Sequence, residues 1–114
     1  MTITGIYAGF FRFQITWIGF EPITASDGKE AVQKAIAEKP DLIRMDFVMP
    51  ARNGGEATRI LRVTPKTKDI SILAMTALNR KSNLQYCIDV GCNDYIVKPL
   101  PITELQRKIK ALIP

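Results

Sequence analysis

Apolar and polar residues alternate in a regular way from residue 20 to the end of the chain. Short runs rich in apolar and β-branched residues predict strands, and segments with apolar residues every three or four positions predict helices. The expected strands are 21–26, 41–48, 70–77 and 94–99. The expected helices are 27–39, 55–63, 79–91 and 102–113. Strands that alternate with helices predict right-handed crossovers and an α/β fold, in which a parallel sheet carries helices on both faces.

Individual residues mark the ends and faces of these elements. Asp27 and Glu30 resemble a capping box at the start of the first helix. Pro22 favours the edge of the sheet, because it has no N–H to donate to a neighbouring strand. The inward face of helix 79–91 is expected to hold Leu84, Cys87 and Ile88.

The composition is that of a globular domain. The chain has 114 residues, of which 46% are hydrophobic and 24% charged, so one domain with its own core is expected. The chain contains no uncharged apolar run of about 18 residues, so no membrane span is predicted. Residues 1–20 are apolar but lack the basic start and cleavage site of a signal peptide, and we interpret them as part of the fold.

Residue types and charge exclude several kinds of site. The chain has two cysteines and no histidine, which excludes a Cys/His zinc site and a serine or cysteine triad. Cys87 and Cys92 are expected to be free thiols in a reducing cytoplasm. The net charge is +5, but the basic residues are interleaved with acids, so a solvated surface is favoured over a nucleic-acid interface.

Three polar residues stand at the ends of predicted strands: Asp46, Thr76 and Lys98. The carboxyl ends of parallel strands share one edge of a sheet, where ligands bind in this fold class. A carboxylate, a hydroxyl and an amine suit a phosphoryl group, because the carboxylate can accept it and the other two can bind its oxygens. Each residue alone has a structural explanation, as a turn former or a solvated side chain, but the three together favour a phosphoryl site.

The segments around these residues resemble the receiver domain of bacterial two-component response regulators. They are GFEPITASDGKEAV, DLIRMDFVMPARNGG, ILAMTALN and GCNDYIVKPL, in the order and spacing of that family across residues 19–114. The signature Asp-x-x-Met-Pro-x-x-Asn-Gly is complete from Asp46 to Gly54. The resemblance implies a CheY-like, flavodoxin-like three-layer sandwich, with residues 1–114 as a single receiver-like domain.

The resemblance also implies roles for individual residues. Asp46 would be the phospho-acceptor, served by a histidine kinase or a phosphotransfer protein. Thr76 would be the switch hydroxyl that moves onto the phosphate, while the Ala77 N–H and Lys98 bind the phosphate. Tyr95 would be the switch aromatic residue that turns inward as Thr76 shifts.

Further family positions are structural or concern a metal ion. Pro50, Gly54 and Pro99 would shape the loops, and Pro99 would follow a cis peptide bond. Mg²⁺ is the implied cofactor, with Asp46 and the Val48 carbonyl as ligands. The family also uses a pair of acids at the end of its first strand, and their absence here weakens the metal site.

The N-terminal region departs from the family. No Asp or Glu precedes Glu21, and a first strand and first helix would have to fit into residues 1–19. The first βα unit is therefore expected to be truncated or remodelled. Either ITGIYA (3–8) fills the central position in the sheet, or a partner chain does, and an unfilled position would favour dimerisation or strand exchange.

Two other positions carry unusual residues. Arg44 lies two residues before Asp46, where the family has an apolar residue, and both should face the same side of the strand. Arg44 could pair with Asp46 as a substitute cation, or it could extend to water through a face left open by a shortened helix. Gly55 replaces a bulky residue and should weaken the start of helix 55–63.

These observations favour a non-enzymatic receiver domain in cytoplasmic phosphorelay signalling, phosphorylated on Asp46. It would signal to a downstream protein through its 79–113 face. The alternative is a pseudo-receiver, an interaction module that uses the same face without phosphorylation because the acid pair is missing. Nucleic-acid binding is the weakest hypothesis, and no membrane role is expected.

Overall fold

A computed structural model describes residues 3–8, 20–47, 54–76, 81–97 and 102–112 of the chain. The strands are β1 (Ile3–Ala8), β2 (Phe20–Ala25), β3 (Leu42–Asp46), β4 (Ser71–Thr76) and β5 (Asp94–Val97). The helices are α1 (Gly28–Glu38), α2 (Gly54–Val63), α3 (Lys81–Asp89) and α4 (Ile102–Leu112). The eight elements predicted after residue 20 are confirmed, and their described ends agree with the prediction to within two residues. No helix in these ranges has the length and apolar character needed to cross a bilayer.

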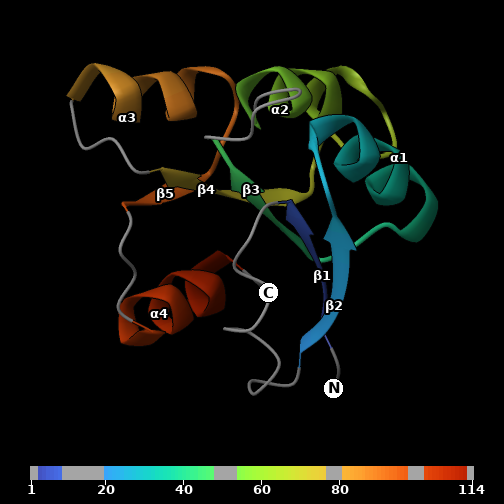
Figure 1. Cartoon of the computed structure of the whole chain (residues 1–114), viewed down its shortest axis with the longest axis horizontal. Helices are drawn as coiled ribbons and strands as arrows, with labels where there is room; N and C mark the ends of the chain where they lie inside the picture. Colours follow the sequence, from blue (N-terminus) through green and yellow to red (C-terminus); the bar gives the residue numbers. More distant parts are fainter. Residues whose placement is uncertain (1–2, 9–19, 48–53, 77–80, 98–101, 113–114) are drawn as a thin grey trace.

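The five strands form one parallel sheet in the order β2-β1-β3-β4-β5. This is the flavodoxin-like order. The segment ITGIYA is the central strand β1, which pairs with β2 from Ile3 to Ala8 and with β3 from Gly5 to Ala8 (Figure 1). A partner chain is therefore not needed to complete the sheet, and no unfilled central position is left to favour dimerisation or strand exchange.

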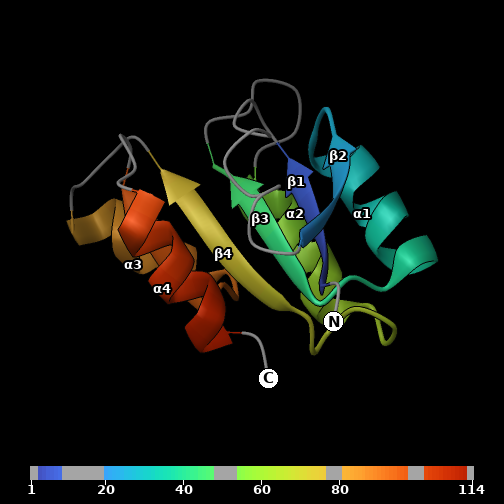
Figure 2. The same ribbon diagram turned by 90° about the horizontal axis from the view of Figure 1, so that it is seen from below.

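Helices cover both faces of the sheet, as predicted. Figures 1 and 2 show α1, α2 and α3 on one face and α4 on the other. The face toward α1–α3 is packed by buried residues that include Ala31, Ala35, Ile43, Met45, Leu61 and Ile72. The face toward α4 is packed by Leu42, Leu73, Met75, Ile96, Leu105 and Ile109. Every residue of β3 is buried, and all but the first of β4, as expected for strands covered on both sides.

The local signals are mostly confirmed. Pro22 lies on the edge strand β2, and Asp27 is the N-cap of α1 and accepts a hydrogen bond from the Glu30 N–H at 2.9 Å. In α3, Cys87 is buried, but Ile88 is 40% exposed. The prediction that Ile88 faces inward was wrong, because adjacent helical residues are about 100° apart and Cys87 takes the central inward position.

A charged side chain ties the end of α2 to two loops. The Arg62 guanidinium donates to the carbonyls of Gly91 at 2.8 Å, Lys68 at 2.8 Å and Ile70 at 2.6 Å. It also donates to Asn93 Oδ1 at 2.8 Å. Arg62 therefore fixes the entries into β4 and β5 relative to α2.

Candidate functional site

Two of the three predicted strand-end residues fall within the described part of the chain. Asp46 is the last residue of β3 and Thr76 the last of β4, and they are 4% and 3% exposed. Asp46 is registered with Met75, one residue before Thr76, so the two residues are diagonal neighbours at the carboxyl edge. Both make polar or ionic contacts within the protein. The structure thus brings the predicted carboxylate and hydroxyl to the same edge.

The hydrogen bonding between β3 and β4 continues one residue past Asp46. The Phe47 N–H donates to the Met75 carbonyl at 2.9 Å, so the chain immediately after Asp46 is held against β4. Lys98 follows Val97, the last residue of β5, in the sequence. The predictions for Lys98 and for Val48, Pro50, Ala77 and Pro99 lie outside the described residues.

A side chain at Gly54, the first residue of α2, would collide with the end of β3. A Cβ atom at Gly54 would lie 2.7 Å from Met45 Cγ and Phe47 Cδ1, and 2.8 Å from the Asp46 carbonyl oxygen. Such distances are shorter than van der Waals contact, so a side chain would push α2 away from the end of β3. The structural role predicted for Gly54 therefore has a physical basis here.

Tyr95 lies half-buried between α3 and α4. Lys108 Nζ is 5.2 Å from the Tyr95 ring centre and donates to the Tyr95 carbonyl at 2.9 Å. Lys108 also binds Asp94 at 3.0 Å. A groove of about 280 Å³ lies beside the ring, lined by Lys81, Leu84, Gln85, Ile88 and Tyr95. Nothing in the sequence pattern indicates this role of Lys108, whose contacts favour the observed position of Tyr95.

The residues do not fit a conventional Mg²⁺ site. The central strand β1 ends at Ala8, which is registered with Ala25 and Met45, so no carboxylate stands at the end of this strand. Within the described ranges, no group of three or more His, Cys, Asp or Glu residues could hold a metal ion. Mg²⁺ prefers near-octahedral oxygen coordination, and Asp46 alone supplies little of it.

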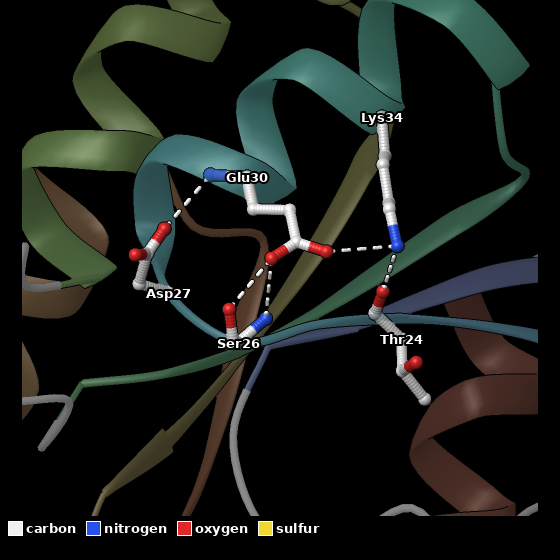
Figure 3. Close-up of polar contacts among 5 residues, drawn as sticks. All are labelled: Thr24, Ser26, Asp27, Glu30 and Lys34. Atoms are coloured by element: carbon white, nitrogen blue, oxygen red, sulfur yellow. Dashed lines mark hydrogen bonds and ion pairs between the residues drawn. The ribbon is translucent and has the colours of Figure 1, made fainter.

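Two other acids lie just after β2, but they serve the start of α1 (Figure 3). The Glu30 carboxylate accepts from the Ser26 N–H at 3.2 Å and from Ser26 Oγ at 2.6 Å, and pairs with Lys34 at 2.9 Å. Lys34 in turn donates to the Thr24 carbonyl. The hydroxyl of Ser26, then Lys34, lower the pKa of Glu30 to about 2. The predicted capping box thus forms in a variant, in which Glu30 reaches back to Ser26 rather than to the N-cap Asp27.

Arg44 is buried, with 3% of its surface exposed. The alternative in which Arg44 extends to water was therefore wrong. Arg44 also makes contacts within the protein. A guanidinium in this position needs an anionic or polar partner, because burying an unpaired charge costs several kcal/mol.

The space left by Gly55 is filled from another helix. A Cβ atom at Gly55 would overlap the Tyr86 phenol ring, whose Cε2 and Cζ would lie 2.8 Å away. Tyr86 also packs edge-on against Phe47, with ring centres 6.2 Å apart, and lies under Arg59. The sequence identified Gly55 as unusual but gave no indication of Tyr86, because the two residues are far apart along the chain.

The two cysteines are free and buried. Cys92 Sγ lies 3.9 Å from Thr58 Oγ1, which also donates to the Gly54 carbonyl at 2.6 Å. Burial raises the pKa of Cys92 to about 12 and also raises the pKa of Cys87. These thiols are therefore structural rather than reactive.

Residues 11–110 match the response regulator receiver domain family. The chain belongs to this family. Receiver domains are the signalling modules of two-component systems, in which they interact with histidine kinases or phosphotransfer proteins and with downstream effectors. They are generally not enzymes.

Several bacterial transcriptional regulatory proteins are similar to the chain in sequence. The chain is 37% identical over 102 residues to the alkaline phosphatase synthesis transcriptional regulatory protein PhoP of Bacillus subtilis, covering 90% of this chain and 42% of PhoP. It is 33% identical over 102 residues to the phosphate regulon transcriptional regulatory protein PhoB of Rhizobium meliloti, covering 90% of this chain and 45% of PhoB. The chain thus spans less than half the length of these relatives.

Solved receiver domains have the same fold. The receiver domain of the sensor histidine kinase PA1611 of Pseudomonas aeruginosa superimposes with a TM-score of 0.90, at 26% identity over 98% of both chains. That structure has a magnesium ion coordinated in its active-site cleft. The chemotaxis protein CheY4 of Vibrio cholerae gives a TM-score of 0.87, at 25% identity over 99% of both chains.

Proposed function

We propose that residues 1–114 form one receiver domain that accepts a phosphoryl group on Asp46 from a phospho-histidine of a histidine kinase or phosphotransfer protein. The observation that carries this proposal is the position of Asp46, buried at the carboxyl end of β3 beside Thr76 at the end of β4. The complete signature from Asp46 to Gly54 supports it. In the reaction, a carboxylate oxygen of Asp46 attacks phosphorus, and the donor nitrogen leaves with the electron pair of the P–N bond.

The remaining residue roles follow from the same proposal. Thr76 would donate its hydroxyl to a phosphoryl oxygen, while Lys98 and the Ala77 N–H would bind the others. Tyr95 would respond to the movement of Thr76. The helix α3, the strand β5 and the helix α4 would then present the changed surface, within residues 79–113, to a downstream protein. The buried free cysteines agree with a location in a reducing cytoplasm.

The second candidate is a pseudo-receiver that is not phosphorylated. It is favoured by one observation: β1 ends at Ala8, and no Asp or Glu precedes Glu21 in the sequence, so this strand contributes no acid to help bind Mg²⁺. A metal that polarises a phosphoryl oxygen is worth several kcal/mol. Its loss alone would slow phosphorylation by roughly two to four powers of ten, so any labelling is expected to be slower than in a receiver with the acid pair.

Intact-mass measurement after incubation with acetyl phosphate and Mg²⁺ distinguishes the two. We expect one added phosphoryl group on the wild-type chain and none on Asp46→Asn. Circular dichroism of both proteins establishes that they are folded. If the folded wild-type protein gains no mass over long incubation, the acceptor proposal fails and the pseudo-receiver is favoured.

A further inference from the structure

We infer that Arg44 supplies the positive charge at the Asp46 carboxylate that a divalent cation supplies in other receivers, so that phosphorylation of Asp46 does not depend on Mg²⁺. This inference rests on the proposed function of Asp46. It concerns a residue of this chain that occupies an ordinarily apolar position, and it follows from the strand geometry, the burial and the surrounding charges.

The strand places Arg44 and Asp46 on the same face of the sheet. Side chains alternate along a strand, and the two packing clusters show the alternation in β3: Ile43 and Met45 belong to the cluster toward α1–α3, and Leu42 to the cluster toward α4. Arg44 and Asp46 therefore share the face of Leu42. Their Cα atoms are two residues apart, which is about 6.6 Å at the usual rise of a strand, and an extended arginine side chain spans this distance.

Burial requires an anionic or polar partner for Arg44. Arg44 is 3% exposed, and its partner in β4 is Leu73, next to Met75 on the same face. These neighbours are apolar and cannot balance a guanidinium, which stays protonated in proteins. Since Asp46 is equally buried at 4% exposure, each residue can neutralise the charge of the other.

The other described carboxylates on the α4 side are engaged elsewhere. Asp94 on β5 binds Lys108 at 3.0 Å. Glu104 on α4 lies 3.7 Å from Arg107 and is 44% exposed. Asp46 is therefore the acidic residue of β3 that can form an ion pair with Arg44.

The missing acids fit this arrangement. The described end of β1 is Ala8, and no Asp or Glu occurs in the sequence before Glu21, so this strand supplies Asp46 with no neighbouring acid to attract a divalent cation. A guanidinium provides positive charge and paired N–H donors, which suit phosphoryl oxygens. It would face the Asp46 carboxylate before the reaction and then bind the phosphoryl group that Asp46 receives.

The chemical step with acetyl phosphate is balanced without a metal. A carboxylate oxygen of Asp46 forms a bond to phosphorus, and the bond between phosphorus and the acetyl oxygen breaks. Acetate leaves with that electron pair, and no proton is transferred. Arg44 stays protonated throughout and stabilises the charge on the phosphoryl oxygens.

The first test compares phosphorylation rates by intact mass in Mg²⁺ and in EDTA. We expect similar rates for the wild-type protein in both buffers. Arg44→Met should slow labelling by about 10- to 100-fold in both, the worth of a charged hydrogen bond, and Arg44→Lys should restore part of the rate. A purely structural role of Arg44 would not make the rate independent of Mg²⁺. If Arg44→Met does not fold, Arg44→Gln replaces it.

The outcomes separate this inference from the proposed function. If EDTA abolishes wild-type labelling, or if Arg44→Met is labelled like the wild-type protein, the inference fails while Asp46 remains an acceptor. If the wild-type protein is labelled in neither buffer, both fail.

A second test needs no phosphoryl donor. Asp46→Asn removes the charge that balances Arg44, so the thermal midpoint of this variant should lie below that of the wild-type protein. The double variant Asp46→Asn with Arg44→Met should regain part of the lost thermal midpoint. A midpoint for Asp46→Asn that is unchanged or higher than wild type would overturn the pairing.

Discussion

The replacement of Arg62 by methionine should strongly destabilise the fold. Arg62 reaches four acceptors, and the carbonyls of Gly91 and Ile70 are partly buried, so water replaces the guanidinium poorly there. The contacts to Lys68 and Asn93 are exposed, and water can substitute at little cost. A hydrogen bond to a charged group contributes about 1.5–3 kcal/mol, and we count two of them, reduced for partial exposure. The expected loss in the free energy of unfolding is about 2–4 kcal/mol.

Urea denaturation followed by circular dichroism measures this loss. The matched control is Arg59→Met on the same helix, where the side chain is exposed and its described contact is the Tyr86 ring at 5.9 Å. The control should lose less than about 1 kcal/mol. Arg62→Lys should behave nearly like Arg62→Met, because an ammonium cannot reach the separate acceptors with a planar fork. The reasoning is refuted if Arg62→Met loses no more than Arg59→Met, or if Arg62→Lys retains full stability.

Three further predictions concern packing and titration. Gly55→Leu should destabilise the protein by about 1–3 kcal/mol, because the leucine overlaps Tyr86. Adding Tyr86→Ala should recover much of this loss. Additive effects of the two substitutions in a double-mutant cycle would contradict the overlap. The pKa of Glu30 is lowered from 4.5 to about 2, so the contribution of Glu30 to stability is complete above pH 4.5 and is lost as the pH falls toward 2. The difference in thermal midpoint between the wild-type protein and Glu30→Gln should shrink over that interval. A constant difference would argue against this role of Glu30. The pKa of Cys92 is raised from 9.0 to about 12, so as the pH rises the thiol of the unfolded chain loses its proton first, and the free energy of unfolding should fall above pH 9. Cys92→Ala should reduce this dependence of stability on pH. Cys92 should react with a thiol reagent only when the protein unfolds.

Much of the fold follows from the sequence because its signals are local. The strand 70–77 and the helix 102–113 were predicted from their apolar patterns, and they form because those apolar residues pack into the core. The edge position of Pro22 follows from its missing N–H. The position of Asp46 and Thr76 at one edge follows from the fact that parallel strands end on the same side.

The remaining features depend on residues that meet only in three dimensions. Nothing near Gly55 in the sequence indicates that Tyr86 fills its space, and nothing near Tyr95 indicates Lys108. Ile88 has the apolar character of an inward residue, yet the α3 helix turns Cys87 to the core. The burial of Arg44 could not be decided from the sequence, because it depends on how completely the face toward α4 is covered.

The positions of Ile3 and Leu112 have a practical consequence for binding experiments. Ile3 begins β1, and the Leu112 carbonyl accepts a hydrogen bond from Ser71 Oγ at the start of β4. Both therefore lie at the amino edge of the sheet, and Figure 2 shows that the carboxyl ends of β3 and β4 are at the opposite edge. A protein immobilised on a sensor surface through either end would present the edge that holds Asp46 and Thr76 to the solution, so either attachment suits measurements of partner binding at that edge.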